Sequence, residues 1–576
     1  MARFRLPKLG SDKSPWLYTS AAVVGLAGLI KLREGVNNYL FSETHCYQSV
    51  RTHWEDEPYA NCFSVSPSGT FSKVFRETSD TQLAKRADTG HVIPGLWDGH
   101  GHLLQYGEFL NAVDLFGSES MEDVQTRVRG YLDDHPGFGT RHEWVRGVGW
   151  DQMALGRMPT ADDLAGDDRL KGLYIMLDRV DVHCIWVSQA VLDLLPESLP
   201  DIPGGEIVRE PGMGVFCDNA MDMVMALWPK PDNKMKQRFV KSAMEKLNEV
   251  GLVGMHDAGA TPENLALFKE LAGGDDWTVR VFSMLECYER DTYCPDEVEK
   301  YISKDGFLHI QSVKLFADGA LGSWGSALIE PYSDRPDTSG SLLVNTSELT
   351  AVTKAWANHG FQVNIHAIGD LANRYAVDAI TAALREVCPG QSPSECQAQK
   401  RFRIEHSQII HPDDQARMHS IGIIPSIQPT HATSDMVYAE KRLGKERTAK
   451  EEYRMHSLLD IHLVLGSDFP VEPSDPFQGI YAAVTRKNPH TGQGTNDYPD
   501  GWHMSEALSL DQAIRGFTEG PAYGSFLEGK AGVIKKGAFA DWVVLDKPLE
   551  EMHIEEFRSL KVRETWVAGK RVYKRN

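Results

Sequence analysis

Two histidines separated by one residue, His100 and His102, follow a short apolar run and are the first residues in the chain with an evident chemical use. Residues two apart on a β-strand project to the same face, so both imidazoles can point at one metal ion. The apolar run and Pro94-Gly95 before them are typical of a buried strand that leads into a site. A chain with 21 histidines can contain this spacing by chance, so its meaning depends on residues further along the chain.

Four more side chains of the metal-binding kind come at or near the ends of later apolar segments: Lys314, His366, His406 and Asp468. Each has an ordinary alternative. A lysine can extend from a strand edge into water, a histidine can be a hydrogen-bonded core residue, and an aspartate after Gly-Ser can cap a helix. Their joint occurrence, in order behind the histidine pair, favours one shared site.

The segments that carry these residues alternate with helical patterns such as 234–250 and 371–387. Strands alternating with helices imply βα units and a parallel sheet, and a (β/α)8 TIM-like barrel is the economical closure for this number of units. Active sites of such barrels lie where the carboxyl ends of the strands meet, so the six side chains are expected to converge there. The apolar runs predicted as strands are 252–255, 279–285, 310–316, 362–365, 402–404, 422–427 and 462–465.

At 576 residues, the chain suits one large barrel with additions. We assign the barrel to residues 91–530. Between its first two strands lie about 150 residues, too many for a βα loop, so an inserted α/β subdomain is predicted at about 111–230. Strand patterns also fill both ends of the chain, and residues 41–90 with 531–576 predict a small β-sandwich domain built from both termini. The patterns are at 46–53, 60–75, 532–546 and 563–573.

The first 40 residues read as an uncleaved signal-anchor. The apolar run Trp16–Ile30 follows basic residues and has no small-residue cleavage site at its far end. The charge balance predicts a single-pass protein of the endomembrane or secretory pathway with a lumenal or external catalytic body. A mitochondrial presequence is the alternative.

The composition disfavours some kinds of partner and some kinds of cysteine chemistry. A formal net charge of −21 argues against a nucleic-acid binder. The eight cysteines include no C-x-x-C pair, which disfavours a zinc ribbon or a redox motif. Cys287 with Cys294, and Cys388 with Cys396, can form short-loop disulfides in an oxidising compartment; scattered reduced thiols are the alternative. Asn345-Thr-Ser347 is a glycosylation acceptor only if the body is lumenal.

In this order the motifs resemble those of the metal-dependent amidohydrolase superfamily, and in particular its Amidohydro_3, or YtcJ-like, branch. The resemblance covers nearly everything after residue 45; only the strand at 46–53 departs from the usual opening. The similar segments are 94–102, 313–323, 366–370, 403–406 and 466–470, with flanking similarity at 144–152, 254–259, 426–431 and 537–546.

The resemblance implies a two-metal hydrolase. His100, His102 and Asp468 are expected to hold one divalent ion, and His366 and His406 a second, with Zn2+ as the expected metal. A carboxylated Lys314 is expected to bridge the two. Asp468 is expected to take a proton from the attacking water and pass it to the leaving nitrogen. The implied reaction is hydrolysis of a C–N bond in an amide, formamide or cyclic amide.

Members with one metal exist, and there the counterpart of His406 contacts substrate instead. His183 and His431 lie in family-like segments and are further candidates for substrate binding, with core or surface positions as the alternative. Glu405 and Asp370 are candidates for orienting the ligand histidines, with caps or surface charges as the alternative.

Two other kinds of function remain open in the sequence. The same ligands serve hydrolysis of an ester, lactone or phosphoester, or an isomerisation, and a barrel can persist as a non-catalytic membrane-anchored binding protein. The expected partner is a small-molecule substrate. The oligomeric state, a homo-oligomer included, is not fixed by the sequence.

Overall fold

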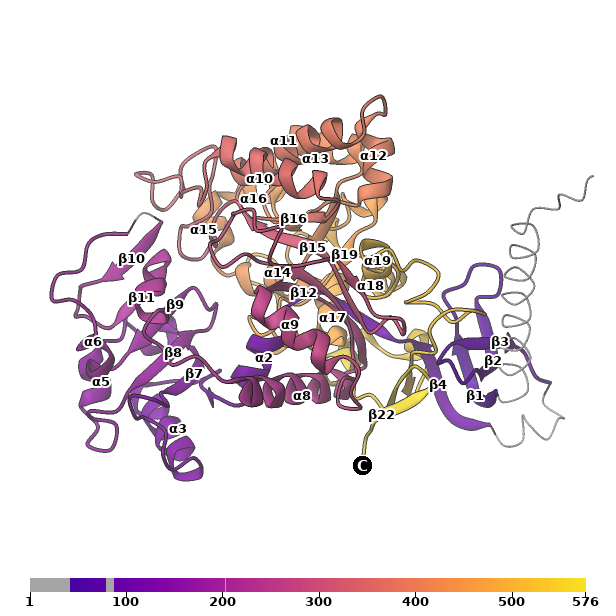
Figure 1. Cartoon of the computed structure of the whole chain (residues 1–576), viewed down its shortest axis with the longest axis horizontal. Coiled ribbons are helices and arrows are strands. Elements are labelled where there is room, and N and C mark those ends of the chain that lie inside the picture. Colours follow the sequence, from indigo (N-terminus) through magenta and orange to yellow (C-terminus); the bar gives the residue numbers. More distant parts are fainter. Residues whose placement is uncertain (1–41, 79–86, 203) are drawn as a thin grey trace, which may run out of the picture.

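Eight parallel strands form the centre of the computed structural model, which describes residues 42–78, 87–202 and 204–576 (Figure 1). Adjacent strands pair in parallel from β5 round to β19. The ring closes where Gly101 bridges Phe469 and the amide of Asp468 donates to the carbonyl of His100 at 2.7 Å. The strands are β5 (Leu96–Gly101), β12 (Leu252–Ala260), β13 (Arg280–Leu285), β15 (Leu308–Phe316), β16 (Gln362–Ala367), β17 (Arg403–His406), β18 (Ile424–Ile427) and β19 (Val464–Leu465). The predicted TIM-like barrel is confirmed.

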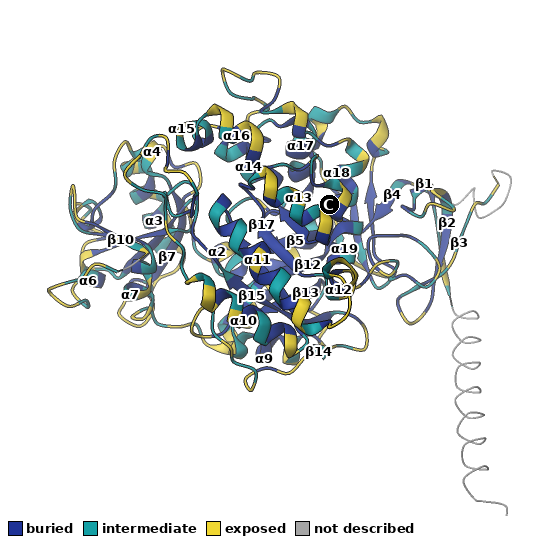
Figure 2. Ribbon diagram, turned by 90° about the horizontal axis from the view of Figure 1, so that it is seen from above, coloured by how far each residue is buried: buried dark blue, intermediate teal, exposed yellow. Residues whose placement is uncertain are grey.

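Helices surround this ring and cover its strands, which Figure 2 shows as buried ribbons at the centre of the molecule. The helix α8 (Asn233–Glu249) illustrates why they form: the side chain of Asp232 caps its first turn, and buried residues recur every three or four positions. The other long barrel helices are α9 (Pro262–Leu271), α10 (Thr346–Asn358), α11 (Asp370–Val387), α13 (Pro412–Ile421) and α17 (Pro476–Thr485). Each packs an apolar stripe against the strands, so the barrel interior is shielded from water.

A second sheet of six strands lies within residues 113–218, beside the barrel in Figure 1. It leaves the barrel after α2 (Leu103–Leu110), returns at α8 and has its own cores around Trp150 and Phe216. Its strands are β6 (Val113–Asp114), β7 (Val145–Trp150), β8 (Ile175–Arg179), β9 (Cys184–Val187), β10 (Gly205–Val208) and β11 (Val215–Asp218). This insert occupies the range that the long gap between barrel strands predicts.

The two ends of the described chain meet in a third sheet of seven strands. β4 pairs with β20 in antiparallel register, so Val92 lies opposite Val544, and the sheet packs around Phe63 and Trp542. The sequence predicts a small β-sandwich from both termini. Strands from both ends do meet here, but they join one continuous sheet in the order β22-β21-β20-β4-β1-β2-β3. They are β1 (Glu43–Arg51), β2 (Tyr59–Val65), β3 (Phe71–Phe75), β4 (Asp88–Pro94), β20 (Trp542–Leu545), β21 (Glu564–Val567) and β22 (Lys570–Lys574).

One predicted strand is much shorter than its pattern. Of residues 532–546, only Trp542–Leu545 is a strand. Gly532 and Gly537 have φ angles of +68° and +86°, which an extended strand does not allow, so the chain turns twice before it enters the sheet. The apolar pattern of residues 532–546 therefore belongs to a largely buried loop at its start and to a strand only at Trp542–Leu545.

The predicted signal-anchor lies outside the described residues. Among the residues that are described, the structure contains no helix with both the length and the apolar character needed to cross a membrane.

All eight cysteines are paired, and none is free. The two short-loop pairs considered from the sequence, Cys287–Cys294 and Cys388–Cys396, are disulfides. Two more disulfides, Cys46–Cys62 and Cys184–Cys217, join residues directly opposite one another on neighbouring strands. The spacing along the chain gave no hint of these two because each depends on strand register.

Candidate metal centre

The six side chains expected to form the site meet at the carboxyl end of the barrel. His100 is on β5, Lys314 on β15, His366 on β16 and His406 on β17. His102 directly follows β5, and Asp468 is the third residue after β19. Possible ligand atoms of three of them, His100, His406 and Asp468, lie within 4.8 Å of one another. Residues from five strands therefore share one small volume.

His100 is fully buried and makes contacts through both ring nitrogens. Its Nδ1 lies 2.5 Å from Oε2 of Glu405. Its Nε2 lies 3.3 Å from Nζ of Lys314 and 3.4 Å from Oδ1 of Asp468. The ionised carboxylate of Glu405 accepts a hydrogen bond from Nδ1–H of His100. The free lone pair of the ring is therefore on Nε2, which faces the centre of the cluster.

The carboxylate of Asp468 is held between several imidazoles. Its Oδ1 lies 3.1 Å from Nε2 of His102, and its Oδ2 lies 3.8 Å from Nε2 of His431. The backbone of Asp468 has a φ of +62°, an unfavourable value for a residue with a side chain. Strain of this kind persists only where the surroundings fix it, and it is common at functional sites.

Asp98 holds the backbone around Asp468 in place through hydrogen bonds. Its carboxylate accepts hydrogen bonds from the amide of His100 at 2.9 Å and from the hydroxyl of Ser467 at 2.7 Å. One buried carboxylate thus connects the backbone beside one candidate ligand to the residue preceding Asp468. No role was predicted for Asp98. The only available signal was its place in the family-like segment 94–102, two residues before His100.

His366 and His406 form the other half of the cluster, with ring centroids 4.4 Å apart. Nδ1 of His406 lies 3.0 Å from Oε1 of Gln428, which leaves its Nε2 for another partner. Nε2 of His366 is buried and has no hydrogen-bond partner among the described residues. A buried polar atom without a partner is costly, and a bound ligand is the usual explanation at such a position.

Burial sets the charge state of these groups. It lowers the pKa of His100 to about 4, with the charge of Lys314 acting in the same direction. Burial likewise lowers the pKa values of His366, His406 and Lys314. Burial alone would raise the pKa of Asp468, but His100 and His102 outweigh it and hold that pKa well below its usual value. Neutral imidazoles beside an ionised carboxylate are the protonation states that a divalent metal requires.

The donor set therefore fits a divalent metal such as zinc. It offers imidazole nitrogens and a carboxylate in a buried cluster, and Nε2 of His366 has no hydrogen-bond partner in the described part of the chain. Glu405 and Gln428 accept from the outward nitrogens of two of the histidines, as metal-ligating histidines usually require.

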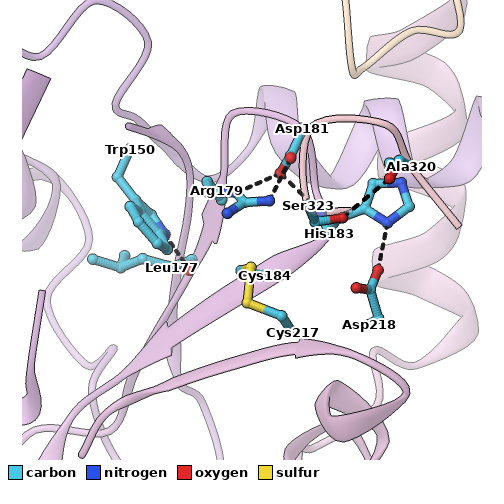
Figure 3. Close-up of a disulfide and its surroundings, with 10 residues drawn as sticks. All are labelled: Trp150, Leu177, Arg179, Asp181, His183, Cys184, Cys217, Asp218, Ala320 and Ser323. Carbon is cyan, nitrogen blue, oxygen red and sulfur yellow. Dashed lines mark hydrogen bonds and ion pairs between the residues drawn. A yellow bond between two sulfur atoms is a disulfide. The ribbon is translucent and has the colours of Figure 1, made fainter. Parts of the chain in front are cut away.

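The insert contributes a charged cluster on the side of the barrel mouth (Figure 3). Nδ1 of His183 lies 2.8 Å from Oδ1 of Asp218, and Arg179 is paired with Asp181 in the same loop. Burial opposes a charge on His183, but the hydrogen bond to Asp218 outweighs it and raises the pKa of this histidine. Burial is the main cause that lowers the pKa of His366, and the charge of His183 acts in the same direction.

Of the two remaining candidate residues, His431 lies at the centre and Asp370 does not contact a ligand-type histidine in the described chain. The ring of His431 is parallel to that of His406, with centroids 6.2 Å apart, so it lines the centre. Asp370 accepts from the backbone amide of Ile329 at 2.9 Å, and no contact joins it to a ligand-type histidine in the described chain. The carboxylate that approaches His366 is Asp318, at 3.8 Å. Asp318 and Gln428 lie in the family-like segments 313–323 and 426–431, but no pattern in the sequence marked their side chains as partners of the ligand histidines.

Protonation of the imidazoles of His100, His366 and His406 is expected to change zinc affinity by less than about twofold between about pH 7.5 and about pH 5.5, because burial lowers their pKa values, that of His100 to about 4. A histidine with the ordinary pKa near 6.5 would be mostly protonated at the lower pH and would cost about tenfold in affinity. Competition with a chelator of known proton affinity measures this. A loss of about tenfold or more per histidine would show that the imidazoles titrate as exposed groups.

Comparison with known proteins agrees with this geometry. A sequence model described as "Amidohydrolase family" matches residues 87–573. A protein named "Putative amidohydrolase YtcJ" from Bacillus subtilis is 26% identical over 529 residues, which span 89% of this chain and 94% of the relative. An "N-substituted formamide deformylase" from Arthrobacter pascens is 27% identical over 519 residues, 84% of this chain and 88% of the relative. The crystal structure of an uncharacterized metal-dependent hydrolase from Pyrococcus furiosus is 26% identical, has a TM-score of 0.67, and the match covers 88% of this chain and 99% of that one.

Proposed function

This chain belongs to the amidohydrolase family, as a metal-dependent hydrolase, and from that premise we propose that it cleaves a C–N bond in an amide, formamide or cyclic amide. The observation that carries the proposal is the meeting of four histidines, a lysine and an aspartate at the carboxyl end of the barrel, around the close group of His100, His406 and Asp468. The name of one relative, an N-substituted formamide deformylase that aligns over 88% of its length, supports the formamide class.

The contacts described above support an assignment of the metal ligands. In the proposal, His100, His102 and Asp468 hold one zinc ion, and His366 and His406 hold a second. Nζ of Lys314 lies 3.3 Å from Nε2 of His100, one of the ligands in this assignment. Because burial lowers the pKa of Lys314, its amine is available in the neutral form, which adds to carbon dioxide and loses a proton to give a carbamate. The carbamate would be an anionic ligand shared by both ions.

The chemical step divides between the metal and the protein. When bound, divalent zinc polarises the scissile carbonyl and lowers the pKa of a coordinated water. Asp468, ionised and held by its neighbours, accepts the proton of the attacking water and then donates it to the leaving nitrogen. His431, beside Asp468, and His183, across the mouth, are positioned to bind the substrate. Glu405 and Gln428 keep His100 and His406 in the ring orientation that the ligands need.

Replacing Lys314 with alanine is expected to lower the metal content from about two ions to about one per chain and to reduce activity more than about a hundredfold, since the shared anionic ligand is removed. Metal analysis of the purified protein and steady-state kinetics measure both effects. The exposed Lys304, replaced by alanine in the same way, is the control and should keep both metals. A Lys314→Ala protein with full metal content and full activity would exclude the bridging role.

The bond specificity is tested with matched substrates. N-substituted formamides, N-acyl amines and cyclic amides are compared with esters and phosphoesters of similar size, using protein that is chelated and then reloaded with zinc. Release of amine from the C–N substrates, lost on chelation and restored by zinc, is the expected result. Turnover of only the esters or phosphoesters would refute the assignment of the bond and leave the family membership intact.

A further inference from the structure

The pairing of all eight cysteines bears on the cellular compartment in which this chain folds. Each of the three structural units contains its own disulfide: Cys46–Cys62 in the terminal sheet, Cys184–Cys217 in the insert and two more in the barrel. No cysteine is left as a free thiol. Disulfides form and persist in oxidising compartments and are rare where cellular reductants keep thiols reduced. Four independent pairs, with none left over, therefore indicate folding in an oxidising compartment.

The disulfides also differ in kind. Cys46 with Cys62 and Cys184 with Cys217 staple adjacent strands at directly opposed positions, while Cys287–Cys294 and Cys388–Cys396 close short loops between elements. A zinc site does not explain them, because the pairs lie in separate units and no pair has metal-type spacing.

A separate observation concerns Asn345, which begins the only Asn-x-Ser/Thr triplet in the sequence. Asn345 is exposed and is the N-cap of α10: its Oδ1 accepts from the amide of Glu348 at 2.9 Å and from the hydroxyl of Ser347 at 2.7 Å. Both bonds use Oδ1. Its Nδ2 makes no hydrogen bond to any residue that the structure describes. The atom that would carry a sugar is therefore open to solvent while the other atom of the same amide caps the helix.

We propose that the chain matures in an oxidising secretory compartment and carries an N-linked oligosaccharide on Nδ2 of Asn345. In the transfer, a bond forms between Nδ2 and the anomeric carbon of an oligosaccharide carried on a lipid diphosphate. The bond from that carbon to the diphosphate oxygen breaks, Nδ2 loses one proton, and the lipid diphosphate leaves. No oxidant or reductant is consumed.

The position of Asn345 suits this modification. The helix cap survives it, because Oδ1 is unchanged and still accepts both hydrogen bonds. Two residues earlier, the amide of Leu343 donates to the carbonyl of Ala317, directly after β15, which fixes Asn345 at the catalytic end of the barrel but on its outer surface. A glycan there extends into water, outside the metal centre, so it needs no rearrangement of the fold.

The test uses the full chain, with its own N-terminal segment, expressed in cultured eukaryotic cells. Treatment with an enzyme that removes N-linked glycans is expected to lower the apparent mass by one step. Thiol labelling of the denatured, unreduced protein is expected to find no free cysteine. Asn345→Asp keeps an oxygen that can cap the helix but removes the nitrogen that would carry the glycan. Ser347→Ala destroys the triplet. Both variants should therefore abolish the shift in apparent mass. Ser347→Thr keeps the triplet and should retain it.

Two results would refute the glycan on Asn345, and a third would refute the oxidising compartment. One is wild-type protein whose Asn345 is unmodified by mass spectrometry of the peptide that contains it, whatever the state of its thiols. The other is a mass shift that persists unchanged in Asn345→Asp. Reactive thiols on otherwise folded protein would refute the oxidising compartment itself. None of these readouts depends on enzymatic activity, so they remain informative if the proposed reaction is wrong.

Discussion

Replacing Asp468 with asparagine is expected to lower kcat/KM for a formamide or amide substrate by roughly a thousandfold, within the range that removal of a general acid–base group produces. Asparagine has nearly the shape of aspartate but cannot accept the proton of the attacking water. It also lacks the charge that the cluster of His100, His102 and His406 stabilises. Steady-state kinetics on the zinc-loaded protein measure the loss.

The control for this variant is Asp460→Asn, which changes an exposed aspartate eight positions earlier and should leave kcat/KM unchanged. Metal content of both variants separates a chemical role from a binding role. An Asp468→Asn protein with one or two bound metals and little activity supports proton transfer by Asp468. Activity within about threefold of wild type would contradict both roles that we propose for it.

The second large effect concerns stability. Arg403→Met is expected to lower the free energy of unfolding by about 3–5 kcal/mol, the usual cost of breaking a buried ion pair by removing one partner. Arg403 and Glu405 are both fully buried, and their two hydrogen bonds are 2.8 and 3.0 Å long. The guanidinium also donates to the carbonyl of Gly99 and the hydroxyl of Ser426. Methionine would leave the Glu405 carboxylate buried beside His100 without its cation.

Urea unfolding of the metal-free protein at neutral pH measures this loss. Arg575→Met is the matched control, because Arg575 pairs with Asp546 at the surface, where the two side chains are 37% and 53% exposed. Its replacement should cost no more than about 1 kcal/mol. Equal losses in the two variants would mean that the Arg403–Glu405 pair is no more important than a surface ion pair.

Much of the candidate site could be predicted from the sequence because its ligands come at or just after strand ends. His100, His366 and His406 stand at the carboxyl ends of apolar runs that are barrel strands, and the topology of a parallel barrel brings such ends together. Lys314 required the family resemblance as well, since a lysine within an apolar strand has no metal-binding meaning on its own.

The partners of those ligands could not be predicted in the same way. Asp98 meets Ser467 only because β5 closes the ring against β19, and a one-residue shift of register would turn the side chain to the other face. Asp318 and Gln428 also come just after barrel strands, but nothing in the sequence shows that their side chains turn toward ligand histidines. The placement of His183 depends on how the insert packs beside the barrel, which local sequence patterns do not encode.

The proposed mechanism depends on two zinc ions, one held by His100, His102 and Asp468 and the other by His366 and His406. Anomalous diffraction at the zinc edge tests this assignment most directly. Crystals of zinc-loaded protein are predicted to show an anomalous peak within coordination distance of Nε2 of His100 and a carboxylate oxygen of Asp468, and a second peak beside His366 and His406. A fully loaded protein with no anomalous peak at these side chains, or with its zinc bound elsewhere, would contradict the account.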